Sequence, residues 1–288
     1  MKFAYMIMAH NNLNQLCRLL KLLDDQENDI YLHIDKKSVG MDTTKIDGIV
    51  KYACIHIYRK YNVRWGGSTQ VKCQMFLLSE AIKTPHEYYH LISGQDLPIK
   101  SNMEIQEFFT KNKGKEFVHF ESDGFCQKEN CRYYNIGRGK LAAYLIAIQK
   151  KLNVQRKLYC GANWYSITSE LATDFCAHKG QLIKMVRWTK CSDEYILQTF
   201  IRRVTTKKYQ FYKTTLEPDD YGGTARLIDW KRGEPYVWRE MDFQEIAKSD
   251  RMYARKFDER IDDKIIEMIF NKIMDGNQNA KEYEKTVE

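Results

Sequence analysis

The chain has 288 residues, of which 43% are hydrophobic and 29% are charged, and it contains only 4 prolines and 15 glycines. This composition excludes a disordered or collagen-like protein and is sufficient for a large buried core. The 46 Lys and Arg residues exceed the 38 Asp and Glu residues by eight, so anionic partners are favoured. No dense basic tract points to a nucleic-acid binder.

Neither a standard zinc site nor a membrane span is indicated. The eight cysteines include no C-x-x-C pair. The longest apolar stretch, 141–148, has eight residues, whereas a membrane-spanning helix needs about 20. The first twelve residues, MKFAYMIMAHNN, lack the apolar core and the cleavage site of a secretory signal. We therefore expect a cytoplasmic protein whose cysteines are thiols.

The first hundred residues alternate between predicted strands and helices. In chain order they are strand 2–8, a helix that begins at Leu13, strands 29–35 and 53–58, a helix over about 68–83 with Ser68 as N-cap, and strand 88–93. This alternation is typical of a doubly wound α/β fold with a largely parallel sheet, whose ligands bind beyond the carboxyl ends of the strands. The residues that follow such ends are His10, Asp35 and the segment Ser93-Gly94-Gln95-Asp96.

The alternation weakens after residue 100, where we expect a half of mixed topology. Its predicted elements are strand 116–121, a helical run over 141–148, strand 164–167, a helix from Ser192, strand 224–230, and a helix over 262–274 followed by a polar tail. No internal repeat and no low-complexity linker separates domains. One domain over 1–288 is therefore expected.

Several common catalytic motifs are absent from the sequence. It contains no G-x-G-x-x-G, no P-loop, no H-E-x-x-H and no G-x-S-x-G. No D-x-D follows a predicted strand, and the nearest carboxylate pairs are Glu121 with Asp123 and Glu217 with Asp219. We expect neither a metal site nor a bound cofactor.

Eight segments, taken together and in order, resemble one known family: MIMAHNN, IYLHIDKKS, WGGST, HLISGQDLPIKSN, GANWYSIT, SDEYILQTF, RLIDWKRGEP and SDRMYARKFDE. They are similar to the core-2/I-branching β-1,6-N-acetylglucosaminyltransferases, a family that also contains the peptide O-xylosyltransferases. The resemblance implies a GT-A-like glycosyltransferase fold. Its Rossmann-like nucleotide-binding half would cover about 1–100, and its mixed-topology acceptor and catalytic half would cover 101–288. It also implies an inverting, metal-independent transfer from a UDP-sugar.

Such a reaction needs a general base for the acceptor hydroxyl and positive charge for the leaving diphosphate. By resemblance, Glu194 is the base, although an acidic residue in the first turn of a helix capped by Ser192 also favours the helix dipole. By the same resemblance Lys256 binds the diphosphate, with a solvated lysine as the alternative. Arg232 and Arg239 are both candidates for its partner, and Arg232 is slightly preferred.

The remaining donor-site candidates surround the expected nucleotide pocket. The resemblance implies that Asp35 accepts hydrogen bonds from uridine, although an aspartate that caps its own loop is the alternative. His10 helps to shape the pocket or is structural. Arg64 and Trp65 form another wall of the pocket, unless Trp65 packs in the core. Gln95 and Asp96 are expected mainly to organise loops.

For the acceptor, Glu121, Lys128 and Arg132 resemble the sugar-contacting Glu, Lys and Arg of the family in order and spacing. An aromatic platform completes many sugar sites, and Trp164 or Trp230 can supply it, although each can equally belong to the core.

The expected function is therefore transfer of a sugar, N-acetylglucosamine first among the options, from a UDP-sugar to a hydroxyl of a glycan acceptor in β linkage. The alternatives are UDP-xylose or another UDP-hexose as donor, or a non-catalytic glycan- or nucleotide-binding module. Because no anchor is evident, we expect a cytoplasmic enzyme that acts on a lipid-linked acceptor, with peripheral contact to the inner face of the membrane as a further option. No nucleic-acid partner is expected.

Overall fold

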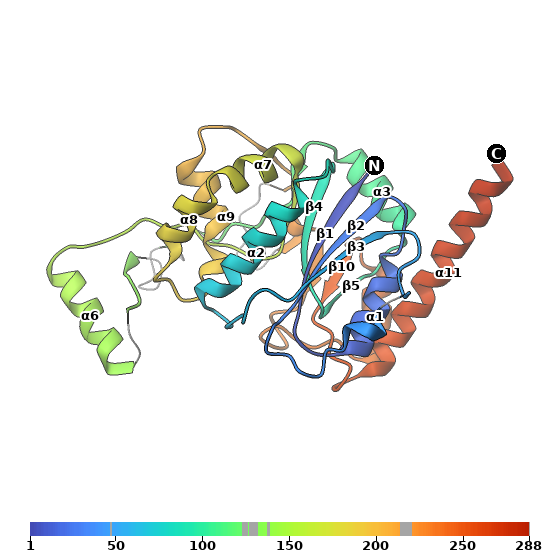
Figure 1. The fold of residues 1–288 in the computed structure, drawn as a ribbon, viewed down its shortest axis with the longest axis horizontal. Coiled ribbons are helices and arrows are strands. Elements are labelled where there is room, and N and C mark those ends of the chain that lie inside the picture. Colours follow the sequence, from blue (N-terminus) through green and yellow to red (C-terminus); the bar gives the residue numbers. More distant parts are fainter. Residues whose placement is uncertain (47, 123–125, 127–131, 137–138, 214–220, 288) are drawn as a thin grey trace.

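The computed structural model describes residues 1–46, 48–122, 126, 132–136, 139–213 and 221–287. A five-stranded sheet with the order β3-β2-β1-β4-β7 runs through its centre (Figure 1). The first four of these strands in the chain are parallel, and β7 pairs antiparallel with β4. The strands are β1 (Phe3–Ala9), β2 (Asn28–Ile34), β3 (Cys54–Tyr58), β4 (Tyr88–Ser93) and β7 (Ser166–Thr168). The predicted α/β class with a largely parallel sheet is confirmed.

The central strands are buried because helices cover both faces of the sheet, so alternate residues of β1 enter two different cores. Phe3, Tyr5 and Ile7 pack in the core on the side of α1. Ala4 and Met6 pack in the core on the side of α2. In Figure 1, α1, α3 and α11 lie on one side of the sheet, and α2, α7, α8 and α9 lie on the other.

The helices are α1 (Leu13–Leu22), α2 (Ser68–Ala81), α3 (Asn102–Lys111), α6 (Gly139–Lys151), α7 (Ser169–Ala177), α8 (Lys179–Val186), α9 (Ile196–Thr199), α10 (Phe243–Lys248) and α11 (Asp263–Val287). Short 3-10 turns, η1 (Thr43–Lys45), η2 (Ser192–Glu194), η4 (Tyr221–Thr224) and η5 (Glu240–Asp242), and one π-helical turn, η3 (Phe200–Val204), complete the helical elements. Helix α6 stands away from the rest of the molecule (Figure 1).

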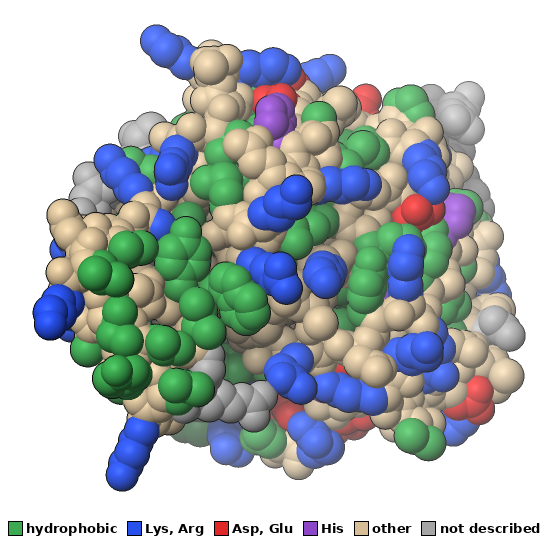
Figure 2. All heavy atoms as spheres, turned by 60° about the vertical axis from the view of Figure 1, so that its left-hand side comes forward, with side chains coloured by type: hydrophobic (Ala, Val, Ile, Leu, Met, Phe, Trp, Pro, Cys, Tyr) green, Lys and Arg blue, Asp and Glu red, His purple; other side chains and the backbone are tan. Residues whose placement is uncertain are grey.

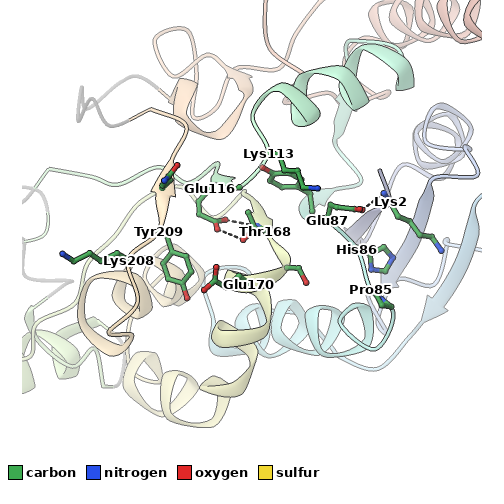
Figure 3. A pocket seen from close by; sticks show the side chains of 14 residues that line it. Lys2, Pro85, His86, Glu87, Lys113, Glu116, Thr168, Glu170, Lys208 and Tyr209 are labelled. Atoms are coloured by element: carbon green, nitrogen blue, oxygen red, sulfur yellow. Dashed lines mark hydrogen bonds between the residues drawn. The ribbon is translucent and has the colours of Figure 1, made fainter.

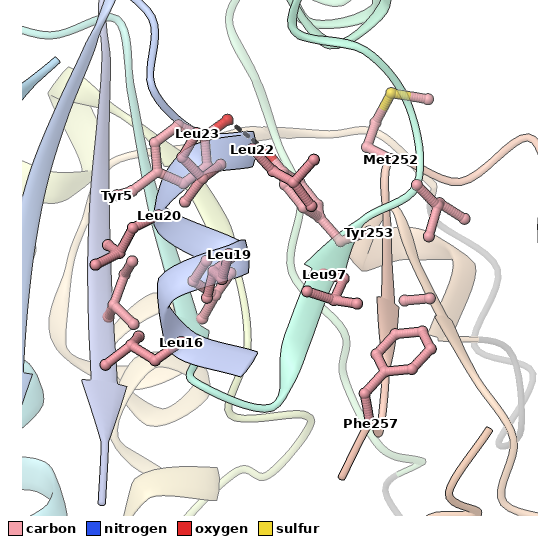
Figure 4. Packing of buried hydrophobic residues seen from close by; sticks show 14 of the residues in the cluster. Tyr5, Leu16, Leu19, Leu20, Leu22, Leu23, Leu97, Met252, Tyr253 and Phe257 are labelled. Atoms are coloured by element: carbon pink, nitrogen blue, oxygen red, sulfur yellow. Dashed lines mark hydrogen bonds between the residues drawn. The ribbon is translucent and has the colours of Figure 1, made fainter. Parts of the chain in front are cut away.

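Helix α1 packs between the main sheet and a second, smaller sheet. Figure 4 shows Leu16 and Leu20 pointing toward β1, while Leu19 points toward Leu97 of the second sheet. All four leucine side chains are buried. The apolar residues whose spacing predicts a helix from Leu13 therefore pack against both sheets.

The second sheet has the order β5-β10-β9, and a two-stranded ladder joins β6 to β8. Its strands are β5 (Asp96–Pro98), β9 (Arg226–Ile228) and β10 (Tyr253–Arg255), and the ladder is formed by β6 (Lys115–Glu116) and β8 (Gln210–Phe211). Arg226 connects the second sheet to the first: its buried guanidinium donates to the carbonyl oxygens of Leu91 at 3.1 Å and Tyr165 at 2.8 Å. These bonds hold β9, and through it β10, against the main sheet.

Several sequence-based predictions need correction. Ser68 does not cap α2, because Gly67 occupies the N-cap position and the cap has no side-chain hydrogen bond. The strand expected over 116–121 is limited to β6 and a single bridge from Phe117 to Ser166. The polar tail expected after residue 274 is helical, because α11 continues to Val287.

Replacement of Leu20 tests the packing of α1 against the sheet. Leu20→Ala should lower the free energy of unfolding by about 2–5 kcal/mol, because it removes a fully buried side chain and leaves a cavity. Urea denaturation followed by circular dichroism measures this change. Val39→Ala is the control: Val39 is 96% exposed, and its replacement should change the value by less than about 0.5 kcal/mol. Equal effects of the two substitutions would contradict the packing described.

Candidate active site

Polar residues follow the carboxyl ends of three neighbouring parallel strands. His10 follows β1, Asp35 follows β2, and the turn that leads into Asp96 follows β4. Because parallel strands end at one edge of a sheet, these residues lie on the same edge. This is the edge at which an α/β fold of this kind binds ligands.

The pKa of His10 is affected by charged residues from two parts of this edge. Its surface is largely exposed, yet desolvation of the ring lowers its pKa below the ordinary value. Asp35 opposes this shift, whereas Lys256 and Lys37 add to it. The side chain of Asn12, in the loop after β1, donates to Oδ1 of Asp258 at 3.0 Å, so this loop and the segment after β10 lie side by side.

Asp35 is buried and organises the loops beside it. Its two carboxylate oxygens accept hydrogen bonds from the backbone amides of Lys37 at 3.1 Å and Val63 at 3.2 Å. The ammonium group of Lys37 lies 3.7 Å from the same carboxylate. Asp35 therefore caps its loop, as the alternative interpretation holds, and any contact with a uracil ring would use its remaining acceptor capacity.

Lys256 follows β10 and is half-buried. Its pKa is lowered from the usual lysine value, first by desolvation and then by the neighbouring Arg255, while Asp258 and Asp96 act in the opposite direction. An ammonium group in a partly desolvated position interacts more strongly with an anion than one in bulk water. This environment suits a phosphate-binding role better than a fully solvated lysine would.

Arg255 forms a buried pair that the sequence does not reveal. Its Nε lies 3.4 Å from Oδ1 of Asp96, and its guanidinium stacks 4.4 Å from the ring centroid of Trp164. Within the described residues, Nε and Nη1 of Arg255 have no hydrogen-bond partner. The only sequence signal is its place next to Lys256 in the A-R-K-F-D segment. Trp164 thus supports Arg255 with one face and is partly buried.

Glu194 lies on the 3-10 turn η2, and its side chain is exposed. Ser192 does not cap a helix here as expected: Cys191 occupies the N-cap position in the left-handed conformation, and Ser192 is buried. α9 begins only at Ile196. Glu194 therefore lies on a short 3-10 turn and not in the first turn of a helix. Because the dipole of such a short turn is small, it does not account for an acidic residue at this position.

Two neighbouring segments hold this turn in place. The amide of Cys191 donates to the carbonyl oxygen of Gly66 at 2.9 Å, and the side chain of Gln70 donates to Asp193 at 2.6 Å. On the other side, the amide of Gly161 donates to the carbonyl oxygen of Glu194 at 2.9 Å. Burial raises the pKa of Asp193 to about 6. Asp193 thus faces inward and Glu194 faces outward.

Gly161 is required by this packing. A Cβ atom at this position would lie 1.9 Å from the carbonyl oxygen of His119. The side-chain amide of Gln198 donates to the carbonyl oxygens of His119 at 3.1 Å and Ala162 at 2.9 Å. The segment that leads from Gly161 to Trp164 is therefore fixed next to the Glu194 turn.

Arg64 and Trp65 belong to the loop that contacts this turn through Gly66. Both side chains are exposed, and Trp65 is 80% exposed. The interpretation that Trp65 packs in the core is therefore wrong. An exposed aromatic ring beside a carboxylate turn remains a candidate for contact with a ring-shaped ligand.

The preference for Arg232 as the partner of Lys256 is not supported by the structure. Its guanidinium is already paired with three carboxylates, those of Asp229, Asp242 and Glu245. Arg239 is exposed and lies in the segment whose Trp238 donates its amide to the carbonyl oxygen of Lys256 at 3.0 Å. Arg239 is therefore the better candidate.

The expected acceptor residues are only partly brought together. The amide of Glu121 donates to the carbonyl oxygen of Cys160 at 2.8 Å, next to Gly161 and thus near the Glu194 turn. Arg132 instead bonds the side chain of Gln155 at the base of α6. Trp230 is 43% exposed just beyond β9. Lys128 lies outside the described residues.

A cavity of about 650 Å³ lies at the opposite, amino-terminal edge of the sheet (Figure 3). Two of the polar side chains that line it pair within the protein. Glu116 accepts hydrogen bonds from the amide and hydroxyl of Thr168 at 2.8 and 2.6 Å, and Lys2 pairs with Asp29 at 3.0 Å. Burial raises the pKa of Glu116 to about 7. We therefore place the candidate site at the carboxyl edge. Among the residues that the structure describes, no three His, Cys, Asp or Glu side chains are grouped as metal ligands.

The sequence is similar to those of known xylosyltransferases and N-acetylglucosaminyltransferases. Xylosyltransferase 2 of Rattus norvegicus is 19% identical over 299 residues, which cover 93% of this chain and 33% of that protein. Beta-1,3-galactosyl-O-glycosyl-glycoprotein beta-1,6-N-acetylglucosaminyltransferase 3 of Mus musculus is 22% identical over 92% of this chain and 66% of its own length. The chain thus spans less than two thirds of these relatives. The solved structure of mouse xyloside xylosyltransferase 1 in its apo form covers 88% of this chain and 97% of that chain, at 10% identity and a TM-score of 0.38.

The family model described as Core-2/I-Branching enzyme matches residues 3–251. This range ends just before β10 and includes His10, Asp35 and Glu194. The predicted family and the GT-A-like α/β fold are confirmed. The chain belongs to the core-2/I-branching enzyme family of glycosyltransferases.

Proposed function

We propose that the protein is an inverting glycosyltransferase that moves a sugar, N-acetylglucosamine first, from a UDP-sugar to a hydroxyl of a glycan acceptor in β linkage without a metal ion. The observation that carries this proposal is the arrangement of two opposite charges on one edge of the sheet. Lys256 is half-buried on a segment that lies beside the loop of His10, and the exposed Glu194 lies on a turn fixed by the loop of Arg64 and Trp65 and by the segment of Trp164.

In this mechanism Glu194 accepts the proton of the acceptor hydroxyl while the oxygen attacks the anomeric carbon. The bond to the diphosphate breaks at the same time, and negative charge develops on the departing phosphate oxygens. Lys256 stabilises that charge in its partly desolvated position, with Arg239 as the proposed partner. The rigid attachment of the Glu194 turn fixes the base relative to the donor.

The donor sugar is the least constrained part of the proposal. Both an N-acetylglucosaminyltransferase and a xylosyltransferase are among the relatives, at similarly low identity. Release of UDP from a panel of UDP-sugars separates these donors. A non-catalytic binding module would bind UDP but release none from any of them.

Lys256 should contribute directly to binding of the diphosphate. In the presence of EDTA, UDP should bind the parental protein and raise its melting temperature, because the ligand binds only the native state. Lys256→Ala should weaken UDP binding by roughly 10- to 150-fold, the equivalent of a charge-assisted hydrogen bond worth about 1.5–3 kcal/mol. Isothermal titration calorimetry measures the dissociation constant.

Lys113→Ala is the matched control, since Lys113 is an exposed lysine at the opposite edge, where it lines the cavity. It should leave UDP affinity unchanged. Binding of UDP that requires manganese would refute metal independence. Equal affinities of the Lys256→Ala variant and the parental protein would transfer the phosphate role to Arg239.

Glu194 should act on the rate and not on binding. Glu194→Gln should lower turnover of the best UDP-sugar by roughly 10²- to 10⁴-fold, because glutamine keeps the size of the side chain but cannot accept the proton. UDP affinity should remain within about twofold of the parental value. Glu107→Gln, at an exposed glutamate of α3, is the control and should leave both quantities unchanged. Parental turnover in the Glu194→Gln variant would exclude Glu194 as the base.

Asp193 should affect stability and not the rate. Burial raises the pKa of its carboxyl well above the usual aspartate range, to about 6, so the folded state holds this proton over a pH range in which the unfolded chain has lost it. The stability contribution of Asp193 therefore falls as the pH rises from about 4 to about 6 and stays low above that range.

Asp193→Asn removes this titration. It should stabilise the protein relative to the parental form by on the order of 2 kcal/mol at pH 7.5 and by much less at about pH 4. Urea denaturation at several pH values tests this. An identical pH dependence of the two proteins would contradict the assignment, and a loss of turnover as large as that of Glu194→Gln would make Asp193 the base.

A further inference from the structure

Helix α6 is unlike the other long helices of the protein because none of its residues is buried, and the structure describes all of them. Its sequence nevertheless contains the longest apolar run of the chain, LAAYLIAI. Leu141 is 57% exposed and Tyr144 is 64% exposed. A helix of this length is marginally stable alone in water, so such a surface points to a partner that covers it.

Apolar residues of α6, none of them buried, form one stripe. Leu141, Tyr144, Ile148 and Leu152 follow one another at spacings of three, four and four, which places them on one side of a helix. Leu152, just beyond the end of α6, is 67% exposed, and its amide donates to the carbonyl oxygen of Ile148 at 2.9 Å. The stripe therefore extends through three turns without interruption.

The apolar surface continues at the base of α6. Trp188 is 42% exposed, and its carbonyl oxygen accepts hydrogen bonds from the amide of Asn135 at 2.7 Å and from Arg156 at 3.2 Å. Figure 2 shows hydrophobic side chains gathered on this side of the molecule, with Lys and Arg side chains around them. The α6 patch comprises Ile136, Leu141, Tyr144, Leu152, Val154 and Trp188, each at least 40% exposed.

The charges of the chain segment that carries α6 are of one sign. The sequence from 131 to 169 contains seven Lys or Arg residues and no Asp or Glu. Lys140 and Lys151 lie at the two ends of α6 and are exposed, and the guanidinium of Arg187 lies 4.9 Å from the ring centroid of Trp188. A second copy of the chain that covered the patch symmetrically would bring these cationic rims together, which is unfavourable. An anionic surface complements them.

We propose that α6 binds the surface of an anionic phospholipid bilayer, with the α6 patch inserted at the level of the headgroups and the basic side chains on the lipid phosphates. An exposed apolar stripe, a tryptophan and flanking lysines are the features of helices that lie in this interface. With 13 residues, α6 is about 20 Å long, shorter than the apolar core of about 30 Å, so it lies on the membrane. None of the helices in the described part combines the length and apolarity that crossing a bilayer requires. This binding does not depend on the donor or on the catalytic residues.

Flotation with lipid vesicles tests the proposal directly. The parental protein should float with vesicles of phosphatidylcholine that contain about 30 mol% phosphatidylglycerol, and much less with phosphatidylcholine alone. Lys140→Gln with Lys151→Gln should weaken binding to the anionic vesicles by roughly 30-fold, since each basic side chain near such a surface contributes about fivefold. Both lysines are exposed, so the fold should not change.

Leu141→Gln with Tyr144→Gln should weaken binding to the same vesicles by about tenfold or more, because it removes inserted apolar area while glutamine preserves helix propensity. The matched control is Met103→Gln with Ile261→Gln, two residues of 43% and 45% exposure in the region of α3 and the start of α11, on the other side of the molecule. The control should bind as the parental protein does. Circular dichroism and turnover of the best UDP-sugar verify that each variant is folded.

Three outcomes would overturn the proposal. The parental protein could fail to float with anionic vesicles, both α6 variants could bind as tightly as the Met103 and Ile261 control, or light scattering could show a parental dimer that Leu141→Gln with Tyr144→Gln dissociates while no protein floats. The last result would assign the patch to a second copy of the chain. Flotation together with an inactive protein would refute the proposed function and leave the membrane proposal intact.

Discussion

The buried guanidinium of Arg226 sets the geometry on which the candidate site depends. It is 2% exposed and donates across the gap between the two sheets, to carbonyl oxygens of β4 and of the segment that leads into β7. Burial lowers the pKa of Arg226 to about 10, so the side chain is still cationic at neutral pH. A buried charge is stabilised only while its hydrogen-bond acceptors are in place. Displacement of one sheet relative to the other would break these bonds together, so they fix the relative position of the two sheets.

Lys256 follows the strand that this connection holds. β9 carries Arg226, β10 pairs with β9 in parallel, and Lys256 comes directly after β10. Glu194 is held through the backbone of Gly66 and Gly161. The two opposite charges of the proposed mechanism therefore come from separate segments of the chain, which meet where Arg255 stacks on Trp164.

The parts of the fold that the sequence predicts are those in which one short segment contains all of the information. β1, α1 and β2 each show their own periodicity, and their bounds differ from the predicted ones by one or two residues. β5 and β10 have three residues each and pair across a long stretch of chain, so no local pattern reveals them. The same reason explains why the sequence favours Arg232 wrongly as the partner of Lys256: its three carboxylate partners are set by the packing of the folded chain. α3 is a different case: no helix is predicted over 102–111, although Ser101 and Glu104 form a capping box that is visible in the sequence.

The segment that carries α6 begins and ends at nearly the same point. The amide of Arg156 donates to the carbonyl oxygen of Arg132 at 2.9 Å, and Gln149 bonds the backbone of Tyr134 within the excursion. A segment whose two ends lie next to each other constrains the rest of the fold very little. Its length and composition can therefore change without displacing the turn that holds Glu194. The surface that α6 presents can therefore change through substitutions, insertions or deletions confined to one segment of the chain.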